Sequence, residues 1–90
     1  MVRPRRCKKI GANPQITFYK PQGVPLRTLQ IMELSLEEWE ALRLKNVEEL
    51  NQTEAAEKMQ TSQSTFQRIL SGAQKKLSKA IIEGMAIKIR

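Results

Sequence analysis

The stretch NQTEAAEKMQTSQSTFQRILSGAQKKLSKAIIEG, residues 51–84, contains two helix patterns separated by a short turn. Asn51 and Glu54 have the spacing of a capping box, in which each side chain accepts a hydrogen bond from the backbone amide of the other residue. This pattern predicts a short helix through Met59. Ser62 is a favourable N-cap for a second helix, because its hydroxyl can accept from an amide of the first helical turn.

The second helix is predicted to be long and amphipathic. Its apolar residues are spaced at three, four and seven positions, which places them on one helical face. Gly84 is placed to end the helix, because glycine readily adopts the left-handed conformation found after helix ends. The expected buried face consists of Phe66, Ile69, Leu70, Ala73, Leu77, Ala80 and Ile81.

The lengths of these two helices and of the turn between them are typical of a helix-turn-helix. Ala55 and Ala56 are small, which lets the helices cross closely, while Met59 and Phe66 are large enough to fill the angle between them. We therefore expect a helix-turn-helix over residues 52–83.

The chain before this motif completes the predicted fold. Ser35-Leu36-Glu37-Glu38 is a second capping box, which predicts a first helix running to about Lys45. Alternating apolar and polar residues predict short strands, whose pairing within one chain or between two chains stays open. The fold class is mainly α, a three-helix core with a basic N-terminal arm. The predicted strands lie near residues 16–20, 29–32 and 85–89, and the arm (1–15) precedes a single domain (16–90).

Composition restricts the function. The 90 residues include no histidine and one cysteine, which excludes histidine-based catalysis and zinc sites built from cysteine and histidine. Glu37, Glu38 and Glu40 are the densest carboxylates, and we interpret them as a solvated helix face. We expect no enzyme activity, no metal and no cofactor. No apolar run approaches the roughly 20 residues that span a bilayer, so we expect a cytoplasmic protein without membrane contact.

The charge indicates a polyanionic partner. Sixteen Lys and Arg residues against nine acidic residues give a net charge of +7. The cations gather at both ends of the chain, and eight of the nine carboxylates lie between Glu33 and Glu57. A basic chain of this kind favours nucleic acid, and double-stranded DNA fits a helix-turn-helix.

Three sets of candidate site residues follow. Polar side chains at the start of the second helix have the chemistry to read base edges in a major groove: Gln63, Ser64, Gln67 and Arg68. Other polar and basic residues are placed to contact phosphates: Gln52, Thr53, Ser71, Lys75, Lys76 and Lys79. The basic arm either lies in a minor groove or is a solvated tail; its cations are Arg3, Arg5, Arg6, Lys8 and Lys9.

The sequence also resembles a family of small uncharacterised prokaryotic proteins predicted to bind DNA. The segments that carry the resemblance are Arg3-Pro4-Arg5-Arg6-Cys7, Phe18…Pro21…Gly23…Pro25-Leu26, Glu40-Ala41-Leu42-Arg43-Leu44, Glu54-Ala55-Ala56-Glu57-Lys58-Met59, Ser62…Thr65-Phe66…Arg68-Ile69-Leu70 and Gly84…Ala86…Ile89. The part from 35 to 82 is similar to region 4 of sigma factors, which implies DNA contact by Gln63, Ser64, Gln67 and Arg68. The sequence departs from the family pattern at Glu49 and Gln60, where the family usually has glycine, and at Gln63, where arginine is common.

These observations predict a transcriptional regulator that binds double-stranded DNA sequence-specifically. One recognition helix reads few base pairs, so we expect a homodimer on a palindromic site. The alternative is a sigma-like adaptor that binds RNA polymerase and has only non-specific affinity for DNA.

Overall fold

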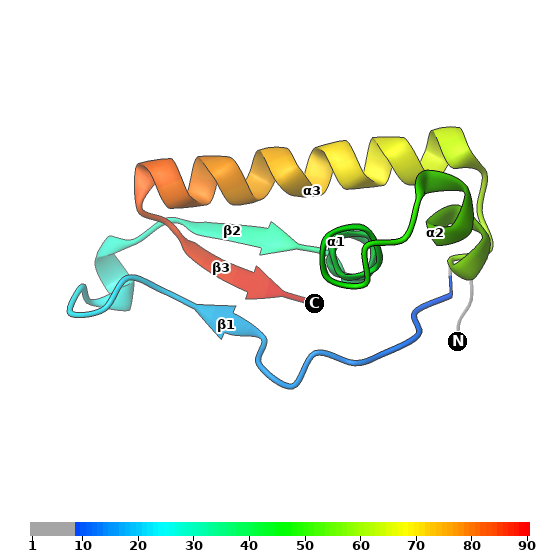
Figure 1. The fold of residues 1–90 in the computed structure, drawn as a ribbon. Coiled ribbons are helices and arrows are strands. Elements are labelled where there is room, and N and C mark those ends of the chain that lie inside the picture. The colour runs from blue at the N-terminus through cyan, green and yellow to red at the C-terminus, as the bar shows by residue number, and fades with distance from the viewer. Residues whose placement is uncertain (1–8) are drawn as a thin grey trace, which may run out of the picture.

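The computed structural model describes residues 9–90 (Figure 1). The arm residues Arg3, Arg5, Arg6, Lys8 and the neighbouring Cys7 lie outside the described residues. The protein is mainly helical with a small three-stranded sheet. The elements in chain order are β1 (Phe18–Tyr19), a 3-10 turn (Leu26–Thr28), β2 (Ile31–Leu34), α1 (Leu36–Leu42), a π-helical turn (Arg43–Val47), α2 (Gln52–Lys58), α3 (Gln63–Glu83) and β3 (Ala86–Ile89).

The helix boundaries agree with the caps predicted from the sequence. Capping boxes formed by Ser35 with Glu38 and by Asn51 with Glu54 begin α1 and α2. The Ser62 hydroxyl accepts from the Thr65 amide at the start of α3. The helix expected to run to about Lys45 instead widens after α1 into the π-helical turn, in which the Glu48 amide donates to the Arg43 carbonyl at 2.9 Å.

The sheet pairs three distant segments of one chain. β3 is the central strand, antiparallel to β1 and parallel to β2. The amides of Ala86 and Ile89 also donate to the carbonyls of Gln30 and Thr17, at 2.9 and 2.8 Å. The strands therefore pair within one chain, which is one of the two possibilities that the sequence left open. Figure 1 shows the sheet below the C-terminal half of α3, with α1 and α2 towards its N-terminal half.

α3 contributes to two adjacent hydrophobic clusters. The first lies between α1, the π-helical turn, α2 and the start of α3, and consists of Ala41, Leu44, Ala55, Ala56, Met59, Phe66 and Leu70. The second joins α3 to the sheet through Leu34, Ala73 and Ile89. The expectation that Ile81 belongs to the buried face was wrong, because its side chain is 72% exposed. Successive residues lie about 100° apart around a helix, so the inward position of Ala80 turns Ile81 away.

Glu40 also differs from the expectation of a solvated face, because it is only 2% exposed. Its carboxylate accepts hydrogen bonds from Nε and a terminal nitrogen of Arg43, both at 2.8 Å, and from the Gly11 amide at 2.9 Å. Burial raises the pKa of this carboxyl, but the hydrogen bonds from Arg43 and Gly11 and the charge of Arg43 outweigh it. The pKa therefore lies below its ordinary value of 4.5.

Replacing Gln60 by glycine is expected to stabilise the protein. Gln60 has a φ of 56°, in the left-handed region, which costs a non-glycine residue about 1 kcal/mol or more. Part of this gain is offset because glycine loses more entropy on folding, so we expect the free energy of unfolding to rise by about 0.5 kcal/mol. Chemical denaturation measures the change. The control Gln74→Gly, within α3, is expected to lower the free energy of unfolding by about 0.5–1 kcal/mol. A lower free energy of unfolding in both variants would contradict the prediction.

Glu40→Gln is expected to destabilise the protein in a pH-dependent way. A carboxyl whose pKa is lowered by folding stabilises above its ordinary value of 4.5 and loses that contribution as pH falls through the folded value. The variant should therefore be about 1–3 kcal/mol less stable at pH 7, and the difference should shrink below about pH 4.5. Denaturation from pH 7 to pH 3 measures it, with the exposed Glu57→Gln as control. If the free energies of unfolding of Glu40→Gln and the wild type differ by the same amount from pH 7 to pH 3, the prediction is wrong.

Candidate functional site

The side of α3 opposite the hydrophobic clusters carries a row of polar side chains, here called the polar face of α3. All of its members are exposed, and they are Gln63, Ser64, Gln67, Arg68, Ser71 and Lys75. The row runs along about 18 Å of helix at 1.5 Å per residue. The helix period separates this face from the buried Phe66, Leu70 and Ala73. The four residues expected to read bases therefore share one exposed surface.

Hydrogen bonds hold several of these side chains in place. The Gln67 amide nitrogen donates to the Ser71 hydroxyl at 3.0 Å, which lays the Gln67 side chain along the helix. At the helix start, the hydroxyls of Ser62 and Ser64 are 3.3 Å apart. The Gln52 side chain of α2 donates to the Gln63 carbonyl at 3.3 Å, so the beginnings of α2 and α3 are linked. The polar face is ordered by contacts within the chain.

The angle between α2 and α3 is fixed by small and large residues in the expected places. Ala55 and Ala56 are fully packed between the helices, and Met59 and Phe66 are inaccessible to solvent. The Thr61 amide donates to the Ala56 carbonyl at 3.0 Å and closes the turn. This packing leaves Gln52 half-buried and Thr53 exposed at the start of α2.

The three lysines in the later turns of α3 lie in different surroundings. Lys75 is exposed on the polar face. Lys79 is also exposed, and its ammonium is 3.1 Å from the Glu83 carboxylate. Lys76 is half-buried and points towards α1 and β2, where its ammonium contacts Glu38 at 2.9 Å. Lys75 and Lys76 diverge because adjacent helical residues are about 100° apart, so Lys76 does not share the surface of the other expected phosphate contacts.

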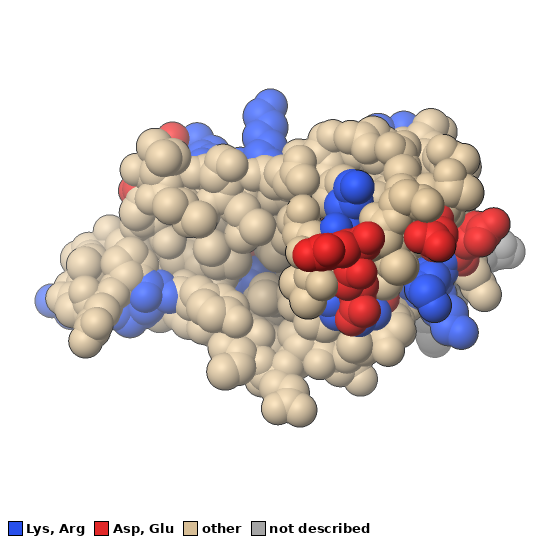
Figure 2. Space-filling model, viewed as in Figure 1, with Lys and Arg blue, Asp and Glu red and all other residues tan. Residues whose placement is uncertain are grey.

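Acidic side chains are gathered on one part of the surface. Figure 2 shows them where Figure 1 draws α1 and α2, with basic side chains beside and between them, and further basic side chains project from the edge formed by α3. The net charge of +7 is therefore unevenly distributed. An uneven field of this kind orients a polyanion towards the basic surface.

The described part of the predicted arm (9–15) is held beside the turn between α2 and α3. Lys9 is exposed, and its amide donates to the Met59 carbonyl at 3.1 Å. Two residues later, the Gly11 amide donates to the buried carboxylate of Glu40. Sequence reasoning missed this anchor, because a carboxylate three residues before an arginine is also typical of a solvated helix surface. The family segment Glu40-Ala41-Leu42-Arg43-Leu44 was the available signal.

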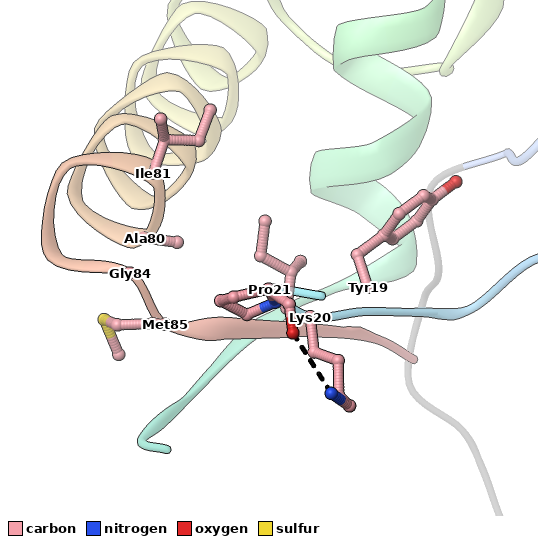
Figure 3. Close-up of a pocket in the computed structure, with 8 residues that line it drawn as sticks. Tyr19, Lys20, Pro21, Ala80, Ile81, Gly84 and Met85 are labelled. Carbon is pink, nitrogen blue, oxygen red and sulfur yellow. Dashed lines mark hydrogen bonds between the residues drawn. The ribbon is translucent and has the colours of Figure 1, made fainter. Parts of the chain in front are cut away.

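A cavity of about 210 Å³ lies under the last turn of α3, away from the polar face, and is lined mainly by apolar side chains and backbone (Figure 3). The Lys20 ammonium at its edge donates to the carbonyls of Pro21 and Val24, at 3.1 and 2.6 Å. The residues that line this cavity include no carboxylate.

Metal binding requires a cluster of ligating side chains, and crossing a membrane by a helix requires a long apolar one. Within residues 9–90 no group of three or more histidine, cysteine or acidic residues is placed to hold a metal ion. None of the helices described there has the length and apolar character needed to cross a membrane.

Comparison with known proteins places the chain in a family. Residues 1–90 match the family model described as protein of unknown function DUF134. The chain is 47% identical to a UPF0251 protein of Desulforudis audaxviator, over 99% of this chain and 58% of the relative. It is 46% identical to UPF0251 proteins of Halothermothrix orenii (98% of this chain, 65% of the relative) and Dehalococcoides mccartyi strain 195 (99% and 76%).

The chain thus spans between about three fifths and three quarters of the length of these relatives. No solved structure matches it. The match over the whole chain, together with identities near 45%, shows that the protein belongs to the family of unknown function DUF134.

Proposed function

We propose that this protein is a cytoplasmic transcriptional regulator, without catalytic activity, that binds double-stranded DNA through a helix-turn-helix formed by α2 and α3. The observation that carries the proposal is the exposure of the polar face of α3 at the start of a helix whose opposite side is buried. A major groove admits one α-helix, and amide, hydroxyl and guanidinium groups pair with base edges there. Gln63, Ser64, Gln67 and Arg68 are the base-reading residues of this proposal.

Phosphate contacts complete the interface. Ser71 and Lys75 continue the polar face beyond the base-reading residues, and Lys79 lies one turn further along α3. Gln52 and Thr53 lie at the start of α2, which crosses the backbone beside the groove in a helix-turn-helix. Lys76 is left out of the interface because its half-buried side chain points towards α1 and β2, away from the polar face. Each lysine placed against a phosphate adds affinity without sequence preference.

A homodimer is part of the proposal. One recognition helix contacts too few base pairs to select a site within a genome. Two copies on a palindrome double the number of base pairs read, with half-sites about 34 Å or a multiple of it apart. The exposed apolar side chains Phe18 and Ile31 lie on the sheet, away from the polar face.

The alternative is an adaptor that resembles sigma region 4 and binds RNA polymerase. The carboxylates gathered over α1 and α2 (Figure 2) favour a protein partner, because carboxylates repel phosphates. This function predicts DNA affinity that is weak and independent of sequence, together with stable binding to the polymerase. The experiments below distinguish the two functions.

Alanine substitution in the first turns of α3 is expected to reduce sequence preference. Gln63→Ala and Gln67→Ala should each lower affinity for a selected duplex by about 1–3 kcal/mol and leave affinity for random duplex nearly unchanged. The preferred duplex is obtained by selection from a random pool, and binding is measured by fluorescence anisotropy. Gln22→Ala is the matched control, since Gln22 is an exposed glutamine in the loop that follows β1, outside α3. Equal losses on both duplexes would exclude base reading and favour the adaptor.

Lys75→Ala is expected to weaken binding to all duplexes alike. Removing one phosphate contact should reduce the slope of log affinity against log salt concentration by about one. Titrations at several salt concentrations measure the slope. Arg27→Ala removes the same charge from the 3-10 turn outside α3, and should leave the slope unchanged. If both variants change the slope equally, the salt dependence is set by the net charge of the protein and not by a phosphate contact of Lys75.

A further inference from the structure

We propose that an apolar groove along one side of α3 is the surface through which two copies of this protein pair, with their α3 helices antiparallel about a two-fold axis near Leu77. The proposal rests on the proposed function, which requires a homodimer but does not say which surface forms it. The partner of the groove is a second copy of the same chain.

The groove consists of three hollows that adjoin one another, because each shares lining residues with the next. The first, of about 210 Å³, lies under the last turn of α3 and is lined in part by Tyr19 and Ile87 (Figure 3). The second, of about 260 Å³, shares these two residues and extends to Trp39 and Leu77. The third, of about 360 Å³, shares Trp39 and Leu77 and ends at Val47. The groove therefore runs from β1 and the end of α3, past α1, to the π-helical turn.

The groove is apolar, and both of its ends are open to solvent. Ile81 and Tyr19 are 72% and 53% exposed at one end, and Val47 is 72% exposed at the other. In Figure 2 the surface below α3 and to the left of α1 is mostly uncharged. Single apolar side chains are common on protein surfaces, but a contiguous apolar patch with charges at its rim is typical of an interaction site.

The two ends of the groove complement each other. Ile81 projects at one end, and the third hollow offers space for an apolar side chain at the other. Lys20 lines the first hollow and donates to backbone carbonyls, while Glu49 lies two residues after Val47 at the far end. Of the ion pairs formed among residues 9–90, none includes Lys20 or Glu49. A two-fold axis exchanges the ends, so each copy presents Ile81 and Lys20 to Val47 and Glu49 of the other.

The polar face of α3 stays free in this pairing. Gln67 and Ser71 lie ten and six residues before Leu77, which places them about 80° and 120° from Leu77 around the helix. A two-fold axis that is perpendicular to α3 and runs along the direction of the polar faces brings both of them to the same side of the dimer. A single duplex on that side then contacts both copies.

The distance between the two polar faces agrees with a palindromic site. Gln63 to Arg68 lie 14 to 9 residues before Leu77, or about 14–21 Å along the helix. A two-fold axis at Leu77 doubles this distance, so the base-reading residues of the two copies are about 27–42 Å apart along the helix direction. Half-sites one helical turn apart are separated by about 34 Å, which lies within this range. This agreement favours a second copy in the groove over a segment of another protein.

The experiment measures dimerisation of the full-length chain by sedimentation velocity over a dilution series. Ile81→Gln removes an apolar side chain from the groove without changing charge. Ile82→Gln is its matched control, because Ile82 is the next residue of α3, is 83% exposed and lines none of the three hollows. Lys20→Glu, Glu49→Lys and the variant with both changes test the exchange of ends. Trp39, the single tryptophan of the chain, reports on the groove through its fluorescence.

We expect the wild-type chain to dimerise, with the emission of Trp39 moving to shorter wavelength as the concentration rises. Ile81→Gln should raise the dimer dissociation constant about tenfold or more, because each dimer loses two buried isoleucine side chains. Ile82→Gln should change it by less than about twofold. Lys20→Glu and Glu49→Lys should each raise it about three- to tenfold, and the double variant should return it close to the wild-type value.

The inference is overturned if the wild-type chain stays monomeric throughout the series, if Ile81→Gln and Ile82→Gln have the same dissociation constant, or if the double charge variant dimerises more weakly than either single variant. A monomeric wild-type chain whose complex with purified RNA polymerase is abolished by Ile81→Gln would assign the groove to the polymerase.

The proposed function is tested separately from this interface. If the dimer forms elsewhere or not at all, loss of sequence preference in Gln63→Ala and Gln67→Ala still supports base reading by α3. If the dimer forms through the groove but binds selected and random duplexes equally, the proposed function is overturned and the interface stands.

Discussion

The fold depends on the need to bury one apolar stripe along all six turns of α3. In the N-terminal part of this stripe, Phe66 and Leu70 pack into the cluster with α1 and α2. Further along, Ala73 packs against Leu34 and Ile89 of the sheet. In proteins most helical stability comes from packing of an amphipathic face, so these contacts are what hold α3 in place. The same requirement leaves the opposite side of α3 exposed over its whole length, and any partner of that side meets a surface held rigid from behind.

Local signals were sufficient to predict the helices but not to predict how the sheet is assembled. Ser35, Asn51 and Ser62 cap helices through atoms within three residues of each cap, so the sequence contains everything that the boundaries require. The strand segments were also near the expected positions. Their pairing was not predictable, because β3 lies between β1 and β2 through contacts across more than fifty residues. The polar face of α3 was predictable for the same reason as the caps, since it follows from helical periodicity alone.

Glu40 and Lys76 have surroundings that are decided by another part of the chain. Glu40 was interpreted as solvated, and it is buried because the Gly11 segment crosses over it and supplies an amide. Lys76 is neutralised by Glu38 from a different helix. Helical periodicity alone showed neither contact. In both cases the missing information was the partner, and burial of a charge is tolerated only when such a partner is present.

The distribution of carboxylates has a consequence for the proposed approach to DNA. If positive charge were spread evenly, a duplex would be attracted to every side, including sides that cannot read bases. The carboxylates gathered over α1 and α2 would reduce the attraction there, although basic side chains lie beside and between them (Figure 2). Glu40 and Glu38 take no part in that repulsion, since Arg43 and Lys76 neutralise them. The exposed acidic residues are therefore the ones that could orient a polyanion, and the paired ones hold the fold together through Arg43, Lys76 and the Gly11 amide.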